Sequence, residues 1–398
     1  MYLSLWYWFF GISMSIVKII TPVHIGTGDL IESPCFHRVN KSDKWYRYSF
    51  SDLIGQLPTQ VVLDEGLLGE LARYNVKKKM LYSAFEKYVR YDDIKPIYEV
   101  EYCGDNSDAK DIQEQIKTNG KPYIPGSSIK GALLHAWFYY EIKHNFNPGF
   151  IEKVLKKNRS INFLDFFGID IKIDKVYSTF MKDLQSCIIC HDIYFKNIEL
   201  FKAIRVGSSS GRDLNLGIYE SIQSGQEIQD DLFVIDYEKL KKLALRYLST
   251  VDSNDKVISK LIDEFDYGIF LKACNEYTID VLGTESEKSC MDMYESYDCS
   301  GIIQFNNQLF EMLKEVENNK EKSCFLRIGN STNYYNKSIA LLIKKKAPSL
   351  FETYFDQVLS PKQWGKQKAS SKTIPKTRVI FENDNLILPP GYIEVTYD

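Results

Sequence analysis

The sequence lacks an excess of positive charge. Its 398 residues include 50 Lys and Arg against 53 Asp and Glu, which gives a net charge of -3. Free-standing nucleic-acid binders usually carry a large basic excess, so any nucleic-acid contact here must come from local patches. The length, with 44% hydrophobic residues, suffices for two hydrophobic cores, because single cores stop growing at roughly 250 residues.

The chain also lacks a disulfide scaffold and an export signal. Its eight cysteines are scattered, which favours free thiols in a reducing cytosol. The apolar run 3–20 has no Lys or Arg before it and no small-residue cleavage site after it. Gly11, Ser13 and Lys18 interrupt this run, whereas a membrane span needs about 20 apolar residues. We expect a cytoplasmic protein without a membrane span, with residues 1–13 as an N-terminal extension.

Familiar catalytic and cofactor motifs are missing too. There is no Walker loop, no Gly-x-Ser-x-Gly elbow and no His-Glu-x-x-His pair. The segment Cys187-Ile188-Ile189-Cys190-His191 has the spacing of a haem attachment site, but that attachment requires export. A structural zinc ion needs four ligands, and a second Cys-x-x-Cys is absent. We interpret these cysteines as buried in a strand; a redox or haem protein remains the alternative, and colour would reveal it.

Hydrophobic periodicity predicts strands and helices in both halves of the chain, hence an α+β fold. The division is expected near residue 200, giving an N-terminal domain over 14–200 and a C-terminal domain over 201–398. Ser51 is the expected N-cap of a first helix. The expected strands cover residues 15–20, 35–39, 45–50, 188–195, 200–206, 217–222 and 324–328, and the main expected helices cover 63–89, 127–143, 237–248, 257–274 and 303–316.

The most informative motif is Tyr123-Ile-Pro-Gly-Ser-Ser-Ile-Lys-Gly-Ala132. It predicts a strand that ends at Pro125, a turn at Gly126, and a helix capped by Ser127 or Ser128. A helix N-terminus carries unpaired amides and a partial positive charge, which suits a phosphate group. Lys130 adds a charge in the first turn. The alternative is a capped helix that merely packs on a sheet.

Two further loops contain glycines. Pro22-Val-His-Ile-Gly-Thr-Gly28 directly follows the first strand. Near the other end, Phe325 to Ser338 contains one glycine, polar residues and two adjacent tyrosines. Glycines permit backbone conformations closed to other residues, and tyrosines stack on nucleobases. A polar turn is the simpler interpretation of the second loop, and a structural hydrogen bond is the simpler role for His24.

The stretch Pro125 to Ala132 resembles the signature of the RAMP superfamily of CRISPR proteins, whose members have ferredoxin-like folds of the RNA-recognition type. The loop at 22–28 is similar to one in the same proteins. The loop at 325–338 departs from the family pattern, because Ser331 and Asn333 stand where glycines are usual. Order and spacing of the three motifs resemble the type III-A (Csm complex) subunit at the guide 3′ end.

This resemblance implies two ferredoxin-like, RNA-recognition-like RAMP domains with helical insertions. It further implies a non-catalytic, cofactor-free subunit that binds the 3′ region of crRNA, supports crRNA maturation and caps the backbone filament. Expected partners are crRNA, target RNA, the backbone RAMP subunit, other type III-A subunits and host nucleases that trim crRNA. The implied RNA-binding residues are His24, Gly26, Gly28, Gly126, Ser127, Ser128, Lys130, Gly131, Gly329, Ser331, Asn333, Tyr334 and Lys337.

Two alternatives share the family. One is a metal-independent endoribonuclease that processes CRISPR repeats with His24, Lys130 and His135; against it, His135 is expected two turns inside the helix, away from a phosphate at the N-terminus. The other is a type III-B RAMP subunit.

The segment 362–378 holds six basic residues and no acidic one, which predicts a flexible basic tail.

Overall fold

The computed structural model describes residues 15–38, 44–72, 78–102, 111–146, 148–149, 152, 175–207, 214–250, 256–319, 322–332, 340–354, 378–383 and 386–397. Helices and strands are mixed along the chain, which confirms the α+β class. The expected extension 1–13, the site residues Asn333, Tyr334 and Lys337, and the basic tail up to residue 377 lie outside the described residues.

A four-stranded antiparallel sheet joins the two ends of the chain. Its order is β13 (Glu227–Gln229), β1 (Ser15–Ile19), β18 (Tyr392–Tyr397) and β15 (Ser323–Arg327). In β1, alternate residues Val17 and Ile19 are fully buried, as the strand period of two requires. The helices α5 (Gly126–His144) and α10 (Tyr267–Glu285) contact each other and β15. Strands β1 and β15 confirm the strands expected at 15–20 and 324–328.

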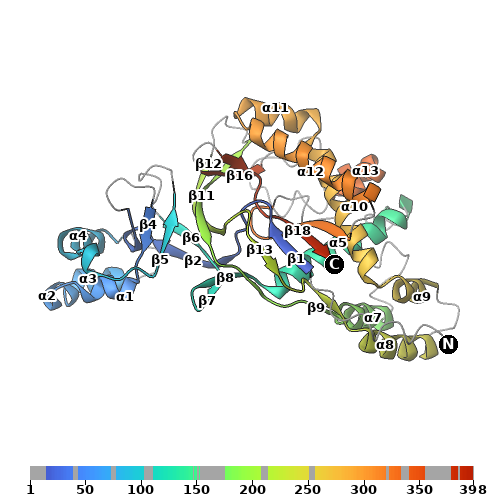
Figure 1. Cartoon of the computed structure of the whole chain (residues 1–398), viewed down its shortest axis with the longest axis horizontal. Coiled ribbons are helices and arrows are strands. Elements are labelled where there is room, and N and C mark those ends of the chain that lie inside the picture. Colours follow the sequence, from blue (N-terminus) through green and yellow to red (C-terminus); the bar gives the residue numbers. More distant parts are fainter. Residues whose placement is uncertain are drawn as a thin grey trace.

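A six-stranded sheet lies beside it, as Figure 1 shows. Its order is β17 (Leu386–Leu388), β16 (Arg378–Asn383), β11 (Ile198–Val206), β12 (Leu214–Ile222), β6 (Asp111–Gln115) and β2 (Gly26–Glu32). Both sheets combine strands from before and after residue 200. Each sheet thus contains strands from both expected domains. The domain division near residue 200 stays a prediction.

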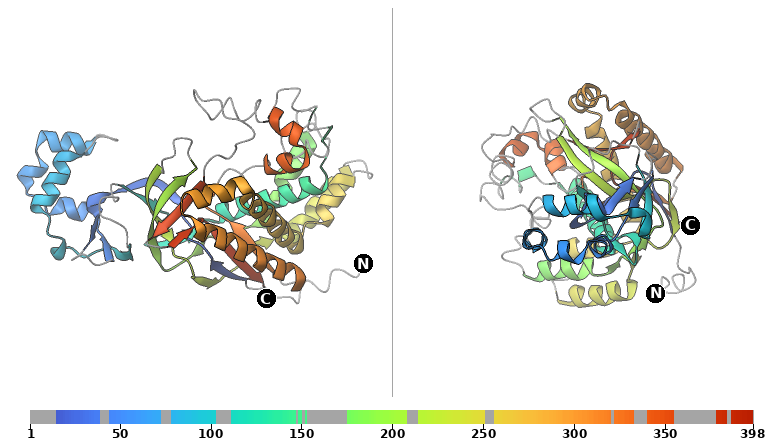
Figure 2. Two further views of the ribbon diagram at one scale, coloured as in Figure 1. Left: turned by 90° about the horizontal axis from the view of Figure 1, so that it is seen from above. Right: turned by 90° about the vertical axis from the view of Figure 1, so that its left-hand side faces the viewer.

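A lobe projects from this body, at the left of Figure 1 and of the left view in Figure 2. It contains β3 (Phe36–Arg38), β4 (Lys44–Arg47), β5 (Tyr98–Glu101), α1 (Phe50–Gly55), α2 (Thr59–Val62), α3 (Glu65–Ala72) and α4 (Lys79–Tyr88). The strands expected near 35–39 and 45–50 correspond to β3 and β4, which pair with each other in antiparallel orientation. The core of the lobe around Trp45, Leu53 and Phe85 continues into the six-stranded sheet at Leu200 and Ile218. Helix α1 begins at Phe50 after Ser49, so Ser51 is not its N-cap.

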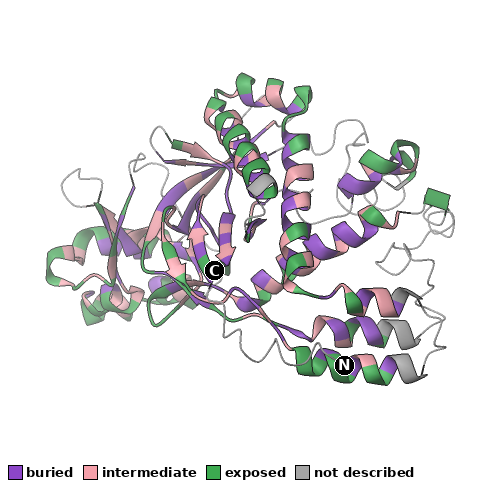
Figure 3. Cartoon of the chain, turned by 45° about the vertical axis from the view of Figure 1, so that its right-hand side comes forward, coloured by how far each residue is buried: buried purple, intermediate pink, exposed green. Residues whose placement is uncertain are grey.

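The remaining helices bury one side against the sheets or each other and expose the other (Figure 3). They are α7 (Lys175–Gln185), α8 (Tyr237–Thr250), α9 (Lys256–Asp263), α11 (Lys288–Ser296), α12 (Ser300–Asn319), α13 (Ala340–Lys346) and α14 (Pro348–Tyr354). The single helix expected over 257–274 is wrong: α9 ends at Asp263, and Asp266 caps α10 by accepting from Ile269 N–H at 2.8 Å. Within the described part of the chain, no helix combines the length and apolar character needed to cross a bilayer.

Candidate functional site

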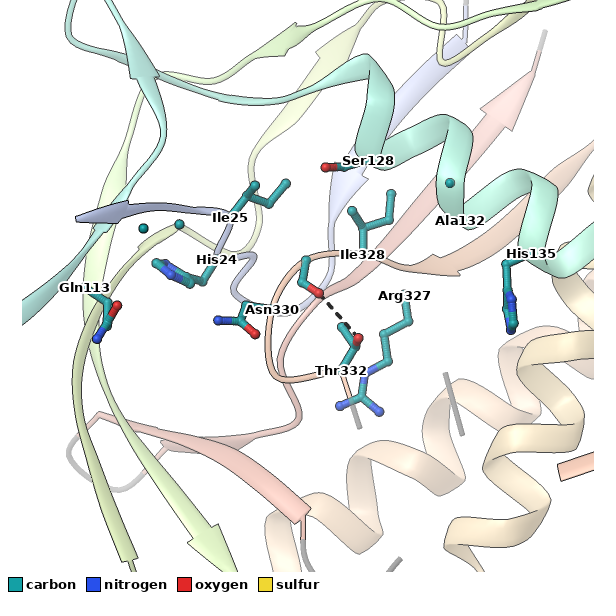
Figure 4. Close-up of a pocket in the computed structure, with 14 residues that line it drawn as sticks. His24, Ile25, Gln113, Ser128, Ala132, His135, Arg327, Ile328, Asn330 and Thr332 are labelled. Atoms are coloured by element: carbon teal, nitrogen blue, oxygen red, sulfur yellow. Dashed lines mark hydrogen bonds between the residues drawn. The ribbon is translucent and has the colours of Figure 1, made fainter. Parts of the chain in front are cut away.

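The three sequence motifs meet around one cavity of about 560 Å³. Its lining comes from the loop after β1 (24–28), from α5 between Ser128 and His135, from the end of β15 with its following loop (327–332), and from Gln113 of β6. Figure 4 shows these segments around the opening. The volume is in the range of ligand-binding pockets, roughly 300–1,000 Å³.

Backbone contacts hold the two loops of this cavity together. Asn330 N–H donates to His24 O at 2.8 Å, and Gly391 N–H donates to Pro22 O at 2.9 Å. Gly329 has φ +100°, and a Cβ there would lie 2.5 Å from His24 O. Only glycine satisfies both the left-handed backbone and this close approach. The glycine kept in the degenerate loop therefore has a packing reason.

His24 lies buried between these loops. Its Nδ1 is 2.6 Å from Glu220 O, and its ring packs edge-on against Tyr219 at 4.7 Å between centroids. Burial lowers the pKa of His24 to about 4; the hydrogen bond to Glu220 opposes this, and the charge of Lys117 adds to it. The imidazole is thus neutral at pH 7. Its Nε2 has no hydrogen-bond partner among the described residues.

A buried polar network fixes the position of the His24 loop. The Glu220 carboxylate is fully buried and accepts hydrogen bonds from Tyr98 O–H, Lys117 Nζ and Gln115 N–H. Gln115 in turn accepts from the Ile25 N–H at 2.8 Å. This network connects the lobe, through Tyr98 of β5, to the cavity. Sequence reasoning missed it; the signal was a Glu inside the apolar strand 217–222.

Arg327 supplies positive charge to the cavity. Its Nε donates to Pro390 O at 2.9 Å, and its guanidinium lies 4.9 Å from the Tyr392 ring centroid. The Nη2 atom is buried without a hydrogen-bond partner among the described residues. No Asp or Glu is among the described residues that line the cavity. The arrangement favours an anion. Arg327 was also missed, although a single Arg within the apolar run 324–328 was a signal.

The signature helix uses its polar groups within the fold. The N-cap of α5 is Pro125 and makes no side-chain cap bond, so the expected cap by Ser127 or Ser128 is wrong. Asp192 instead caps the helix, because its Oδ1 accepts from Gly126 N–H at 2.8 Å. Lys130 Nζ donates to Ile188 O at 2.8 Å. Ser128 and Gly131 line the cavity, whereas Gly126, Ser127 and Lys130 are not among its lining residues.

Gly126 is required by packing against the Cys-x-x-Cys-His segment. A Cβ at Gly126 would lie 2.3 Å from Cys190 O. The strand β9 covers only Ile188–Ile189, so the cysteines flank it; Cys187 is buried and Cys190 is partly exposed. The expectation of two buried cysteines in a strand is therefore wrong. The short strand ends because this segment turns to pack against the start of α5.

His135 lines the same cavity as His24, although it lies two turns into α5, away from the start of the helix as expected. The reason is that α5 runs along the cavity wall. The Nε2 atom of His135 is 3.1 Å from Tyr277 Oη, and burial lowers the pKa of His135 to about 4. Figure 4 shows the two imidazoles at opposite ends of the cavity. Ser331 adopts φ +64° but is not a lining residue.

These loops, sheets and the strand-turn-helix define an α+β protein of the RAMP type. The family model of the RAMP superfamily matches residues 16–362, and the chain belongs to this superfamily. The chain is similar in fold to a chain in the cryo-EM structure of a Csm–crRNA–target RNA ternary complex of a type III-A CRISPR-Cas system, with TM-score 0.63 and 18% identity over 97% of this chain and 100% of that one.

It is also similar in fold to Csm5 of T. onnurineus, with TM-score 0.57 and 17% identity over 95% of this chain and 99% of that one. At these identities the likeness shows a shared fold. A comparison with curated protein sequences gives no match.

Proposed function

We propose that this chain is a non-catalytic RNA-binding subunit of a type III-A CRISPR-Cas effector complex. It binds the 3′ region of crRNA, supports crRNA maturation and caps the backbone filament. The observation that carries the proposal is the cavity itself, where three separate motifs meet around an arginine and no lining carboxylate among the described residues. The full-length likeness in fold to a chain of a Csm–crRNA–target RNA complex supports it.

In this proposal Arg327 binds a phosphate of the guide. A guanidinium offers fixed donors that match phosphate geometry, and its stacking on Tyr392 holds it in place. The loops at 24–28 and 329–332 approach the RNA backbone closely, and Asn333, Tyr334 and Lys337, which follow in the sequence, are further RNA-binding residues in this proposal. The partners are crRNA, target RNA, the backbone RAMP subunit and other type III-A subunits, with host nucleases trimming the guide. The division into two ferredoxin-like units belongs to this proposal.

The cavity is poorly suited to the alternative, metal-independent RNA cleavage by His24, His135 and Lys130. Such cleavage needs one group to take a proton and another to give one. With pKa values of about 4, both imidazoles are almost wholly unprotonated at pH 7, so neither supplies the leaving-group proton. Lys130 is engaged by Ile188 O. These features support a binding role.

The test is reconstitution with the other type III-A subunits and a labelled guide precursor. We expect the wild-type chain to enter the complex and to leave RNA uncleaved when purified alone. Arg327→Gln should lower incorporation and alter guide 3′ ends, whereas Lys314→Gln, on the exposed side of α12, should do neither. Site-specific cleavage by the purified chain that disappears in His135→Gln would contradict the proposal.

A further inference from the structure

We propose that His24 makes the cavity selective for ribose over deoxyribose: its Nε2 accepts a hydrogen bond from the 2′-hydroxyl of a nucleotide whose phosphate is bound by Arg327. This inference rests on the proposed RNA-binding function and adds the chemical group that is recognised. It assigns to His24 a task different from phosphate binding. His24 lines the cavity from the loop after β1, and Arg327 lines it from the end of β15.

The first step is the tautomer of His24. Glu220 O is a carbonyl oxygen and can only accept a hydrogen bond, so Nδ1, 2.6 Å away, must carry the proton. The ring is neutral at pH 7. Nε2 therefore has a lone pair and no hydrogen. An atom of this kind repels a phosphate oxygen and binds a hydroxyl or amine donor.

The second step is that this acceptor is unused. Nε2 is buried and has no partner among the described residues. A buried polar atom without a partner costs about 1–3 kcal/mol, and the great majority of such atoms are paired. A partner supplied by a ligand removes this cost. The ligand must then present a donor to the cavity.

The third step is access. Gly26 is exposed and lines the cavity directly over the imidazole. A Cβ at Gly26 would lie 3.0 Å from Nε2, and its other near neighbours are His24 Cε1 at 3.6 Å and Glu114 O at 3.7 Å. Nε2 is buried, and only the backbone of Gly26 lies between it and the cavity, so in this proposal the 2′-hydroxyl reaches Nε2 when Gly26 shifts aside. An added methyl group would occupy the space that a donor needs to reach it.

The fourth step selects the sugar rather than the base. Proteins that bind bases of single-stranded RNA usually stack them on aromatic rings. No Phe, Tyr or Trp is among the described lining residues. The two lining imidazoles and the Arg327 guanidinium, which could also stack on a base, already pack against Tyr219, Tyr277 and Tyr392. Arg327 Nη2 is buried and has no hydrogen-bond partner among the described residues, which leaves it as an unused donor for a phosphate. Every ribonucleotide presents a 2′-hydroxyl close to a phosphate, so this pair of contacts recognises RNA of any sequence.

The experiment measures binding of the full-length chain to a labelled single-stranded oligouridine as RNA, as 2′-fluoro RNA and as DNA. The 2′-fluoro sugar keeps the RNA-like ring shape but has no donor. We expect wild type to bind RNA about 5- to 10-fold more tightly than either analogue, as for one lost hydrogen bond. Equal affinity for all three overturns the inference. Failure to bind any RNA overturns the proposed function as well.

Two variants test the residues named. In His24→Asn the amide N–H still reaches toward Glu220 O, but the acceptor at Nε2 is gone; in Gly26→Ala a methyl group covers it. Both should reduce the preference for RNA over 2′-fluoro RNA to less than about twofold. Arg327→Gln is the matched control, because it should weaken all three ligands and keep the preference.

An unchanged preference in both the His24 and the Gly26 variant overturns the inference. The base is tested by comparing oligoadenosine with an oligomer of purine riboside, which lacks the exocyclic amine. A loss of affinity that follows the missing amine, and not the missing 2′-hydroxyl, also overturns it.

Discussion

The signature helix α5 and the loop wall of the cavity, formed by residues 24–28 and 327–332, differ in how they use their polar groups. In the first turns of α5, Gly126 N–H donates to Asp192 Oδ1 and Lys130 Nζ donates to Ile188 O, and neither residue lines the cavity. On the loop wall, His24 Nε2 and Arg327 Nη2 have no hydrogen-bond partners among the described residues. The signature stretch at 125–132 thus packs the helix against its neighbours, whereas the unpaired polar groups belong to the loop after β1 and to the end of β15.

The largest effect should separate two glycines of α5, Gly126 and Gly131. Gly126→Val places a Cβ 2.3 Å from Cys190 O, where backbone must move, so we expect a loss of about 3 kcal/mol in the free energy of unfolding. Gly131 has no atom within 4 Å of its Cβ position. Gly131→Ala should therefore be neutral or stabilising by up to about 1 kcal/mol. Denaturant titrations measure both; similar losses would contradict the packing argument.

The next effect concerns acid, with one imidazole on α5 and one on the loop wall. His24 and His135 have folded-state pKa values near 4, below the unfolded value of 6.5. Between these values the unfolded chain binds more protons, so stability falls as pH falls from about 6.5 to 4. For each imidazole the loss from pH 7 to 5 is about 2 kcal/mol. Between pH 7 and 5, the free energy of unfolding of His135→Gln should therefore fall by about 2 kcal/mol less than that of wild type. Parallel pH curves for wild type and variant would contradict the burial of a neutral ring.

A smaller effect is expected at Lys130. Removing its bond to Ile188 O with Lys130→Ala should cost about 1–2 kcal/mol of unfolding free energy. Its RNA affinity should stay within about twofold of wild type, because the ammonium is used inside the fold. Thermal melts and binding assays check both. A stable variant with strongly weakened RNA binding would make the start of α5 the RNA-binding part.

The smallest effect in free energy belongs to the loop wall. Arg327→Gln should weaken RNA binding about tenfold, near 1.4 kcal/mol, and lower the slope of log affinity against log salt by about 0.7, as for one lost phosphate contact. Lys314→Gln, on α12 and not among the residues that line the cavity, is the control and should leave the slope unchanged. Equal slopes for Arg327→Gln and wild type would contradict a contact between Arg327 and an RNA phosphate.

Local features were predictable from the sequence and long-range partners were not. Alternation at Val17 and Ile19 predicts β1, and the strand-turn-helix at Pro125 predicts α5, because these signals depend on neighbouring residues. The partners that decide the roles of Gly126 and His24 are Asp192 and Glu220, 66 and 196 positions away. Periodicity holds no information about such distant contacts, so the cap of α5 was predicted wrongly, and the unpaired atoms His24 Nε2 and Arg327 Nη2 were not predicted.

The family resemblance predicted that three motifs act together, and the structure places parts of all three around one cavity. The resemblance could not distinguish motif residues that pack within the fold from motif residues that line the cavity. His135 illustrates this: helical spacing placed it two turns from the helix start, correctly, yet the wall of the cavity extends that far.

The central claim is that guide RNA lies against the loop wall of this cavity. The most direct measurement is photocrosslinking of the reconstituted complex with thiouridine-containing guide, followed by mass spectrometry of the labelled peptides. The account predicts crosslinks from the 3′ region of the guide to residues 24–28 and 327–332, which weaken in Arg327→Gln. Crosslinks confined to the lobe or to α8, with the cavity loops unlabelled, would contradict it.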